Sequence, residues 1–227
     1  MSQIKAEKSE ARQTEASLSI HALARRQSDH PVDPLFIGRW SPRAFTGEAI
    51  DGQDLLTAFE AARWAPSSLN AQPWRFVFAR LGQARFADFL DLLAERNRQW
   101  AHKAGALVFF LSDSQVAYKD KVMPSPSHAF DTGAAWANFA HQLHLLGYAT
   151  RAIGGFDRAR APEVLGAPAS FHVHAAVAVG RPAEAHTLPD TFREREGPAH
   201  AGPCRNLCSR TSFARNGPAI NAVVQKP

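Results

Sequence analysis

The chain has 227 residues, which is enough for one substantial domain and little more. Hydrophobic residues make up 45% of it, including 15 Phe, so it can bury a full core and is not a disordered protein. No apolar run approaches the ~18 residues of a membrane-spanning helix. Residues 1–17 are polar and lack the apolar stretch of a secretory signal, so we expect a cytoplasmic protein.

The basic character of the chain is confined to its C-terminal tail. Residues 197–227 contain four basic and no acidic residues, so the tail carries +4 of the net charge of +5 and the remainder is nearly neutral. A nucleic-acid-binding protein would carry its Lys and Arg as a stripe on a folded face, so we expect no nucleic-acid partner. Cys204 and Cys208 lie in the same tail with His200, which is too few ligands for a structural zinc site, so we expect no metal.

Hydrophobic periodicity predicts helices that alternate with strands. Apolar residues three or four apart indicate helices, and alternation or a short apolar run indicates a strand. In chain order we expect a short helix over 18–26, a stiff proline-containing loop over 30–34, a helix over 51–64, a strand over 73–80, a helix over 82–96, a strand over 104–112, an irregular connection over 114–127, a long helix over 130–146, a short strand over 150–153, a short helix over 157–165 and a strand over 171–180. Four strands interleaved with helices predict a layered α+β or α/β domain, with the strand 104–112 at the centre of its sheet.

The long helix over 130–146 contains many small residues. They are Gly133, Ala134, Ala135, Ala137 and Ala140. Small side chains allow a backbone to come close to another helix or to a flat ring.

The segment 39–45 contains two arginines and a hydroxyl within five residues. Arg39, Ser41 and Arg43 follow a stiff turn, and the planar fork of a guanidinium suits a phosphate. The segment is therefore a candidate anion clamp, although two arginines on a loop are more often solvated charge.

The segment 65–76 places polar side chains between a predicted helix and a predicted strand. Ser67, Ser68, Asn70 and Gln72 lie in a loop that prolines restrict at both ends. An amide offers a donor and an acceptor on one planar group, which suits the edge of a heterocycle. The alternative is an ordinary polar turn.

Gly154 and Gly155 end a predicted strand just before a predicted helix. Paired glycines permit close backbone approach to a ligand, and N–H groups near the start of a helix can donate to it. A lone Gly-Gly pair is more often only a turn.

Taken together, the three segments resemble the nitroreductase family. The motifs are R-x-S-x-R-x-F, then A-A-R-W-A-P-S-S-x-N-x-Q-P-W-R-F, then I-G-G-F-D after the small-residue helix. The resemblance extends from about His30 to Glu196, and its middle motif is long and specific. It implies an α+β three-layer sandwich, with a mainly antiparallel sheet between helices. It also implies a homodimer with two FMN at the subunit interface, where the helix 130–146 would lie.

The resemblance also assigns roles to individual residues. It implies that the FMN phosphate and ribityl chain meet Arg39, Trp40 (through its backbone), Ser41 and Arg43. It implies that Asn70 bonds the pyrimidine edge of the flavin. The partner subunit's flavin would meet Ser67 and Ser68, and Gly154 or Gly155 would present a backbone N–H to flavin N5.

The activity implied is an FMN-dependent oxidoreductase that passes hydride from NADH or NADPH to a small acceptor. Nitro compounds, quinones, enones and aldehydes are the acceptor classes, and the mechanism would be ping-pong with the chemistry at the flavin. We find no catalytic triad, and we interpret His141, His144, His172 and His174 as packing or surface residues. The alternative is a flavin-binding protein without NAD(P)H turnover, which serves flavin storage, regulation or oxygen-dependent flavin breakdown.

These assignments divide the chain into a leader with a short helix (1–29), an FMN-binding domain (30–196) and an atypical tail (197–227). Relatives follow the lead-in R-E-x-E-x-P with R-x-P-L-x-E, whose arginine reaches the FMN phosphate. This chain keeps the lead-in and loses the rest. Codons for Pro198 to Cys208, displaced by one base, can encode S-x-R-R-P-L-S-E-S-V-F. We therefore hypothesise a frameshift from about Ala199 onward, which would remove that arginine.

Overall fold

The computed structural model describes residues 20–202, of which residues 20–25 form a short helix. The further elements are α2 (Pro34–Gly38), α3 (Gly52–Arg63), the 3₁₀ turn η1 (Ser68–Asn70), β1 (Trp74–Arg80), α4 (Ala84–Asp91), α5 (Glu95–Ala101), β2 (Ala106–Asp113), β3 (Gln115–Tyr118), β4 (Lys121–Pro124), α6 (His128–Leu145), β5 (Ala149–Ile153), α7 (Ala161–Leu165), β6 (Phe171–Gly180), the 3₁₀ turn η2 (Ala185–Thr187) and α8 (Asp190–Arg193). Most of the tail, with Cys204 and Cys208, lies outside the described residues.

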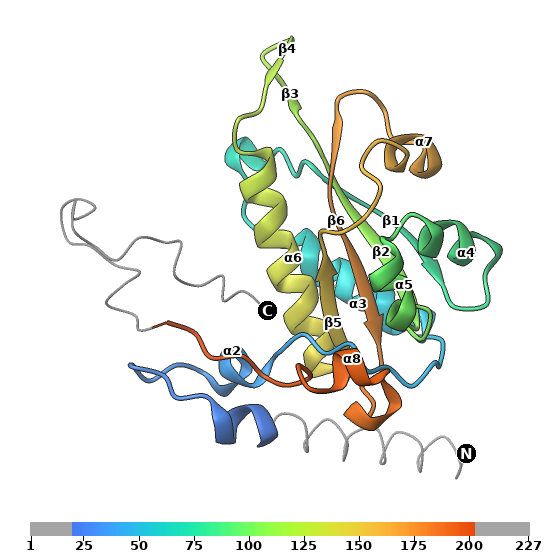
Figure 1. Cartoon of the computed structure of the whole chain (residues 1–227). Coiled ribbons are helices and arrows are strands. Elements are labelled where there is room, and N and C mark those ends of the chain that lie inside the picture. The colour runs from blue at the N-terminus through green and yellow to red at the C-terminus, as the bar shows by residue number, and fades with distance from the viewer. Residues whose placement is uncertain (1–19, 203–227) are drawn as a thin grey trace, which may run out of the picture.

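The centre of the fold is a four-stranded sheet in the order β1-β2-β6-β5. Every neighbouring pair in it is antiparallel, which decides between the two layered classes and confirms the predicted α+β fold. Residues of α3 and α6 share one buried cluster with the sheet, and residues of α4, α5 and α7 share the other. Figure 1 shows α6 running along the sheet, with α2 and α8 near one of its ends.

The strand β2 is buried on both faces, which confirms the expected central strand. Leu107, Phe109 and Leu111 face the α4 side, and the alternate residues face the α6 side; all are at most 2% exposed. A strand covered by helices on both faces loses its polar alternation and becomes a continuous apolar run.

An aromatic cluster joins α3, the sheet and α6. The ring of Phe139 on α6 lies 5.3 Å from the rings of both Phe59 and Phe110, and Phe59 stacks on Phe76 at 5.1 Å. Phe139 and Phe110 are almost completely buried. These contacts hold α6 and α3 in fixed positions against the sheet.

The single helix predicted over 82–96 is wrong, because two helices, α4 and α5, occupy this region. Residues 92–94 between them bond to a distant segment instead of continuing the helix. The N–H of Ala94 donates to Gly155 (3.0 Å), and the carbonyl of Leu92 accepts from Asp157 (2.8 Å). Leu93 itself forms a β-bridge with Phe156.

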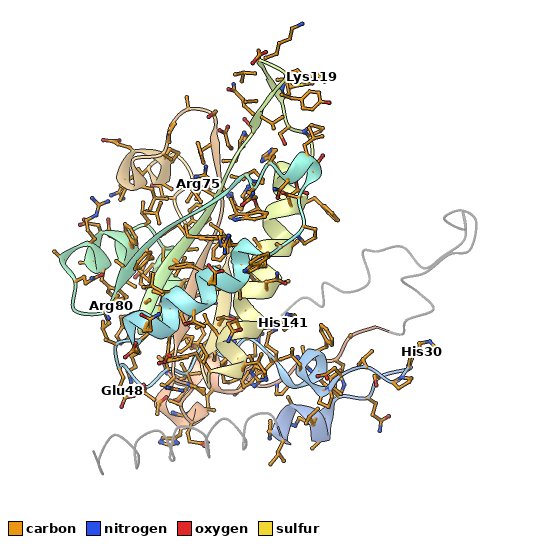
Figure 2. All side chains as sticks on the ribbon, turned by 180° about the vertical axis from the view of Figure 1, so that it is seen from behind. His30, Glu48, Arg75, Arg80, Lys119 and His141 are labelled. Atoms are coloured by element: carbon orange, nitrogen blue, oxygen red, sulfur yellow. The ribbon has the colours of Figure 1, made fainter. Side chains whose placement is uncertain are left out.

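The irregular connection predicted over 114–127 contains a β-hairpin, β3–β4. Its two turn residues, Lys119 and Asp120, both have positive φ, as a two-residue hairpin turn with the twist of the strands requires. The hairpin projects beyond the sheet, with Lys119 at its tip (Figures 1 and 2). The short helices α2 and α8 and the turn η2 were also not expected.

Candidate functional site

The loop 39–43 places a half-buried guanidinium beside the last turns of α6. Arg39 donates to the carbonyl of Trp40 (3.2 Å) and to the hydroxyl of Ser41 (3.3 Å). Neither partner is a carboxylate. Burial, and then the positive charge of Arg26, lower the pKa of Arg39. Among residues 20–202 its charge is therefore partly withdrawn from water beside neutral oxygens, which costs free energy that a bound anion would recover.

A second half-buried guanidinium, that of Arg151 on β5, reaches the same loop. Arg151 donates to the carbonyl of Ser41 and lies over the ring of Trp100, 5.7 Å from its centroid. Burial, and then the charge of Arg43, lower the pKa of Arg151 to about 10, against the opposing effect of Glu196. The structure thus joins Arg151 to the predicted clamp as a third arginine.

The loop is fixed by a carboxylate from the C-terminal side of the domain. One oxygen of Glu196 accepts from the backbone N–H groups of Arg43 (2.5 Å) and Ala44 (3.0 Å). The other pairs with the Arg43 guanidinium at 3.3 Å, and the Glu196 side chain is 3% exposed. Two backbone donors and one cation are therefore held by a single buried anion, which sets the conformation of the loop.

The two glycines after β5 have different surroundings. A Cβ on Gly155 would lie 2.8 Å from Nδ2 of Asn97, whereas a Cβ on Gly154 would meet nothing within 4 Å. The carbonyl of Gly155 also accepts from Asn97 (3.0 Å). Packing therefore explains Gly155, and Gly154 lies open at the position where a ligand could approach the backbone. Sequence patterns gave no reason to select Asn97.

The clamp and the glycine pair lie along one edge of the sheet, because β5 is the outermost strand. Arg151, which holds the clamp, precedes Gly154 by three residues, a distance of about 10 Å in an extended strand. The arrangement suits an elongated ligand with an anionic end at Arg39 and a polar ring at the glycines.

The loop of Ser67, Ser68 and Asn70 lies at the other end of α6. The N–H of Ser68 donates to the carboxylate of Asp131 in the first turn of α6 (3.1 Å), whereas the clamp borders its last turn. Thirteen residues of helix place the two ends about 20 Å apart. Within one chain the structure therefore does not bring this loop to the clamp, and its predicted contacts with flavin stay predictions.

The same loop has an unusual backbone. Leu69, Asn70 and Gln72 all have positive φ, which is uncommon outside glycine. The Ser67 hydroxyl accepts from the N–H of Gln72 at 3.0 Å and holds the loop closed. Such conformations cost free energy and cluster at ligand-binding segments.

The four histidines singled out in the sequence occupy different environments. His141 packs edge-on against Phe36 at 5.2 Å, and Figure 2 shows it on α6 near the N-terminal segment. Burial, and then the charge of Arg39, lower the pKa of both His141 and His144, so they add no positive charge at neutral pH. His172 is exposed, and His174 bonds to Ser112.

Residues 20–202 contain neither a candidate membrane-spanning helix nor a candidate metal site. No helix in this range is long and apolar enough to cross a membrane. No group of three His, Cys, Asp or Glu in the same range is arranged to hold a metal ion.

The chain matches the model of the nitroreductase family over residues 37–181, more than half of its length. Among solved structures, an oxidoreductase containing FMN is 43% identical, with a TM-score of 0.81, and the match covers 83% of this chain and 96% of that chain. A protein of Desulfovibrio desulfuricans in complex with FMN is 25% identical, with a TM-score of 0.62, covering 82% of this chain and 100% of that one.

Curated relatives match over different lengths. An NADH dehydrogenase of Thermus thermophilus is 29% identical over 190 residues, covering 66% of this chain and 88% of its own length. The matches to proteins of Streptococcus pyogenes and Rhodopseudomonas palustris, whose names include NAD(P)H nitroreductase, span only 40% and 44% of those relatives. With the family match, the antiparallel sheet between two helical layers and the clamp beside β5, the conclusion is that the chain belongs to the nitroreductase family.

Proposed function

We propose that the chain binds FMN along the β5 edge and transfers hydride from NADH or NADPH to a small acceptor. The observation that carries the proposal is the clamp, where Arg39 and Arg151 are half-buried and bond to neutral oxygens. A phosphate there would neutralise both guanidiniums.

The residues present fit FMN at both ends of the site. Arg39, Ser41 and Arg43 with Arg151 would hold the phosphate, and Trp40 would border the ribityl chain. The open backbone at Gly154, about 10 Å farther along the edge, would meet the ring. When bound, FMN supplies a ring nitrogen that accepts hydride and releases it again. The names of the relatives and the FMN in two similar structures support this assignment.

The described residues at the β5 edge support direct hydride transfer to the acceptor, without a covalent intermediate on the protein. The described residues offer no nucleophile with a paired base at the β5 edge, so group transfer through the protein is not supported. Nitro compounds, quinones, enones and aldehydes all accept hydride directly. We expect donor and acceptor to occupy the same position in turn, which gives ping-pong kinetics.

The experiment has two stages, both with the full chain. FMN titrated into the protein should lose fluorescence at a stoichiometry of one per chain, and NADH or NADPH should then bleach the bound flavin anaerobically. Absence of quenching at saturating FMN would overturn the proposal. Binding without bleaching by either nucleotide would instead support the alternative of a flavin-binding protein without turnover.

The proposal includes a homodimer, because large apolar side chains are exposed on the α3 and α6 side. Trp64 is 72% exposed, Phe130 84% and Leu145 62%. Gly133 and Ala137 flank the same outward stripe of α6 as Phe130, so a second helix could approach closely. Apolar surface of this extent marks an interaction site.

We expect Phe130→Glu to shift the protein toward monomer, because a carboxylate would be buried without a partner in the interface. Light scattering across a concentration series measures the shift. Val122→Glu on the hairpin, where Val122 is 69% exposed, is the matched control and should leave the assembly unchanged. A wild-type monomer that binds FMN tightly would contradict the dimer.

A further inference from the structure

A buried serine bonds to two histidines at one end of the sheet. The hydroxyl of Ser112 lies 2.6 Å from Nδ1 of His128 and 2.6 Å from Nε2 of His174, and Ser112 is completely buried. Ser112 follows the six apolar residues 106–111 of β2. A hydroxyl enclosed there must be satisfied by these two imidazoles.

His174 reaches Ser112 because it is an extra residue in β6. In the pairing of β2 with β6, Phe110 faces Ala175 and Leu111 faces Val173, so His174 has no partner residue on β2. Such a β-bulge re-aims a side chain and is frequent near functional sites. His128, the first residue of α6, completes the group from the helical layer.

The group lies at the same end of the sheet as the glycine pair. Ile153 on β5 pairs with Ala176 on the antiparallel strand β6. Gly154 comes directly after Ile153, and His174 comes two residues before Ala176, so both lie beyond this pair toward the same end of the sheet. Adjacent strands lie about 4.8 Å apart. The site proposed for the flavin ring and the His128–Ser112–His174 group are therefore neighbours.

His128 also lines a groove under the β3–β4 hairpin. The groove has a volume of about 380 Å³, within the usual range of small-molecule sites. Its lining is half apolar and half polar: Val122, Met123, Pro124 and Pro126 are apolar, and Ser114, Gln115, Ser125 and His128 are polar. Apolar side chains beside polar groups suit a small organic molecule that carries a polar atom such as a carbonyl oxygen.

The hydrogen-bond inventory constrains the protons in this group. Ser112 has one hydroxyl proton, so with neutral imidazoles it donates to one histidine and accepts N–H from the other. If His174 donates through Nε2, the serine donates to Nδ1 of His128, and His128 then carries its proton on Nε2. Hydrogen bonds through Ser112 thus connect the two outer nitrogens of the group, Nε2 of His128 and Nδ1 of His174.

We propose that the His128–Ser112–His174 group is a proton relay for reduction of a conjugated carbonyl acceptor bound in this groove. This rests on the proposed function. With an enone as acceptor, bound FMN would supply the hydride for a C–H bond at the β-carbon, and the displaced π electrons would reach the carbonyl oxygen. That oxygen takes the Nε2 proton of His128. Ser112 passes its proton to Nδ1 of His128, His174 passes Nε2–H to Ser112, and His174 regains a proton from solvent at Nδ1.

The relay works with both imidazoles neutral, and the surroundings keep them so. Burial lowers the pKa of His128, and His172 lowers it further, while Asp113 and Asp131 oppose the shift. Burial also lowers the pKa of His174, with further contributions from His128, His172 and Arg158. The folded state therefore disfavours protonation of either histidine, and at neutral pH each has a free lone pair to accept a relayed proton.

The first test separates the two half-reactions of the FMN-loaded protein by stopped flow. Ser112→Ala and His128→Gln should slow reoxidation by 2-cyclohexenone by on the order of 100-fold, as for loss of a general acid. Bleaching by the nucleotide and reoxidation by ferricyanide, which takes electrons without a proton, should keep wild-type rates. The matched control is His102→Gln, an exposed histidine that follows α5 and bonds to the carbonyl of Arg98, away from Ser112. Equal loss with both acceptors, or no loss with either, would overturn the relay.

The second test needs no turnover. Proton–nitrogen correlation spectra of protein with labelled histidine should show His128 and His174 as neutral single tautomers near pH 7, and Ser112→Ala should convert both to mixtures. Unchanged spectra in Ser112→Ala would overturn the relay even if the protein proves not to use NADH or NADPH. Failure of flavin bleaching with the expected spectra would overturn the proposed function alone.

Discussion

Arg39→Gln should weaken FMN binding by roughly 10- to 150-fold. A hydrogen bond between charged groups contributes about 1.5–3 kcal/mol, which converts to that range of dissociation constants. Arg39 is half-buried and donates to neutral oxygens, so its charge is available to a phosphate in a way that an ion-paired arginine is not. Fluorescence titration of FMN into the variant and the wild type measures the effect.

The same titration with riboflavin, which lacks the phosphate, provides an internal check, because Arg39→Gln should leave riboflavin affinity nearly unchanged. Arg80→Gln is the matched control, since Arg80 ends β1 at the opposite edge of the sheet from β5. Equal losses for FMN in the two variants would show that net charge, not the clamp, governs affinity.

Phe139→Ala should lower the free energy of unfolding by about 3–5 kcal/mol. The ring of Phe139 is fully buried and contacts aromatic rings from α3, β1 and β2, so its removal leaves a cavity that no single neighbour can fill. Urea denaturation, compared at equal protein concentration and without FMN, measures the change.

Tyr118→Ala on the hairpin removes an aromatic ring of similar size that is 43% exposed, and it should change stability by less than about 0.5 kcal/mol. If Phe139→Ala were equally mild, the aromatic cluster would not be what holds α6 on the sheet. A fall in the denaturation slope as well as the midpoint would indicate a less compact native state.

Elements whose signals are local could be predicted from the sequence. The helix α3 begins after Asp51, whose carboxylate accepts from Gln53 (2.7 Å), and its apolar face follows the helical period. The break between α4 and α5 could not be predicted, because residues 92–94 bond to residues 155–157, some sixty positions later. The β3–β4 hairpin was missed because Lys-Asp is not among the usual residue pairs of such a turn.

The candidate site divides in the same way. The segment 39–43 carries its own pattern, whereas Arg151 appears in the sequence as a polar residue within a short strand. Its partner Ser41 lies 110 positions away, and Glu196 reaches Arg43 across 153 positions. Pairings at such separations are set by the fold, and they cannot be recognised from a single sequence that is not aligned with its relatives.

The frameshift hypothesis stays a prediction. Glu196, near the end of the lead-in that resembles the family, accepts from the backbone of Arg43 and pairs with its guanidinium. The chain therefore both resembles the family and packs against the domain as far as this residue. Residues 203–227 lie outside the described residues. Resequencing the gene from the source would decide the matter.

The bulge lets a lineage gain or lose His174 without a change in the pairing of β2 with β6. Because the pairs on either side of His174 are already in register, removal of its codon would leave Leu111 facing Val173 and Phe110 facing Ala175. The other side chains of β6 would stay on their present faces of the sheet, whereas a slip of the strand by one residue would move them to the opposite faces. An imidazole at this position can therefore enter or leave a lineage through a single three-base insertion or deletion, with the rest of the sheet intact.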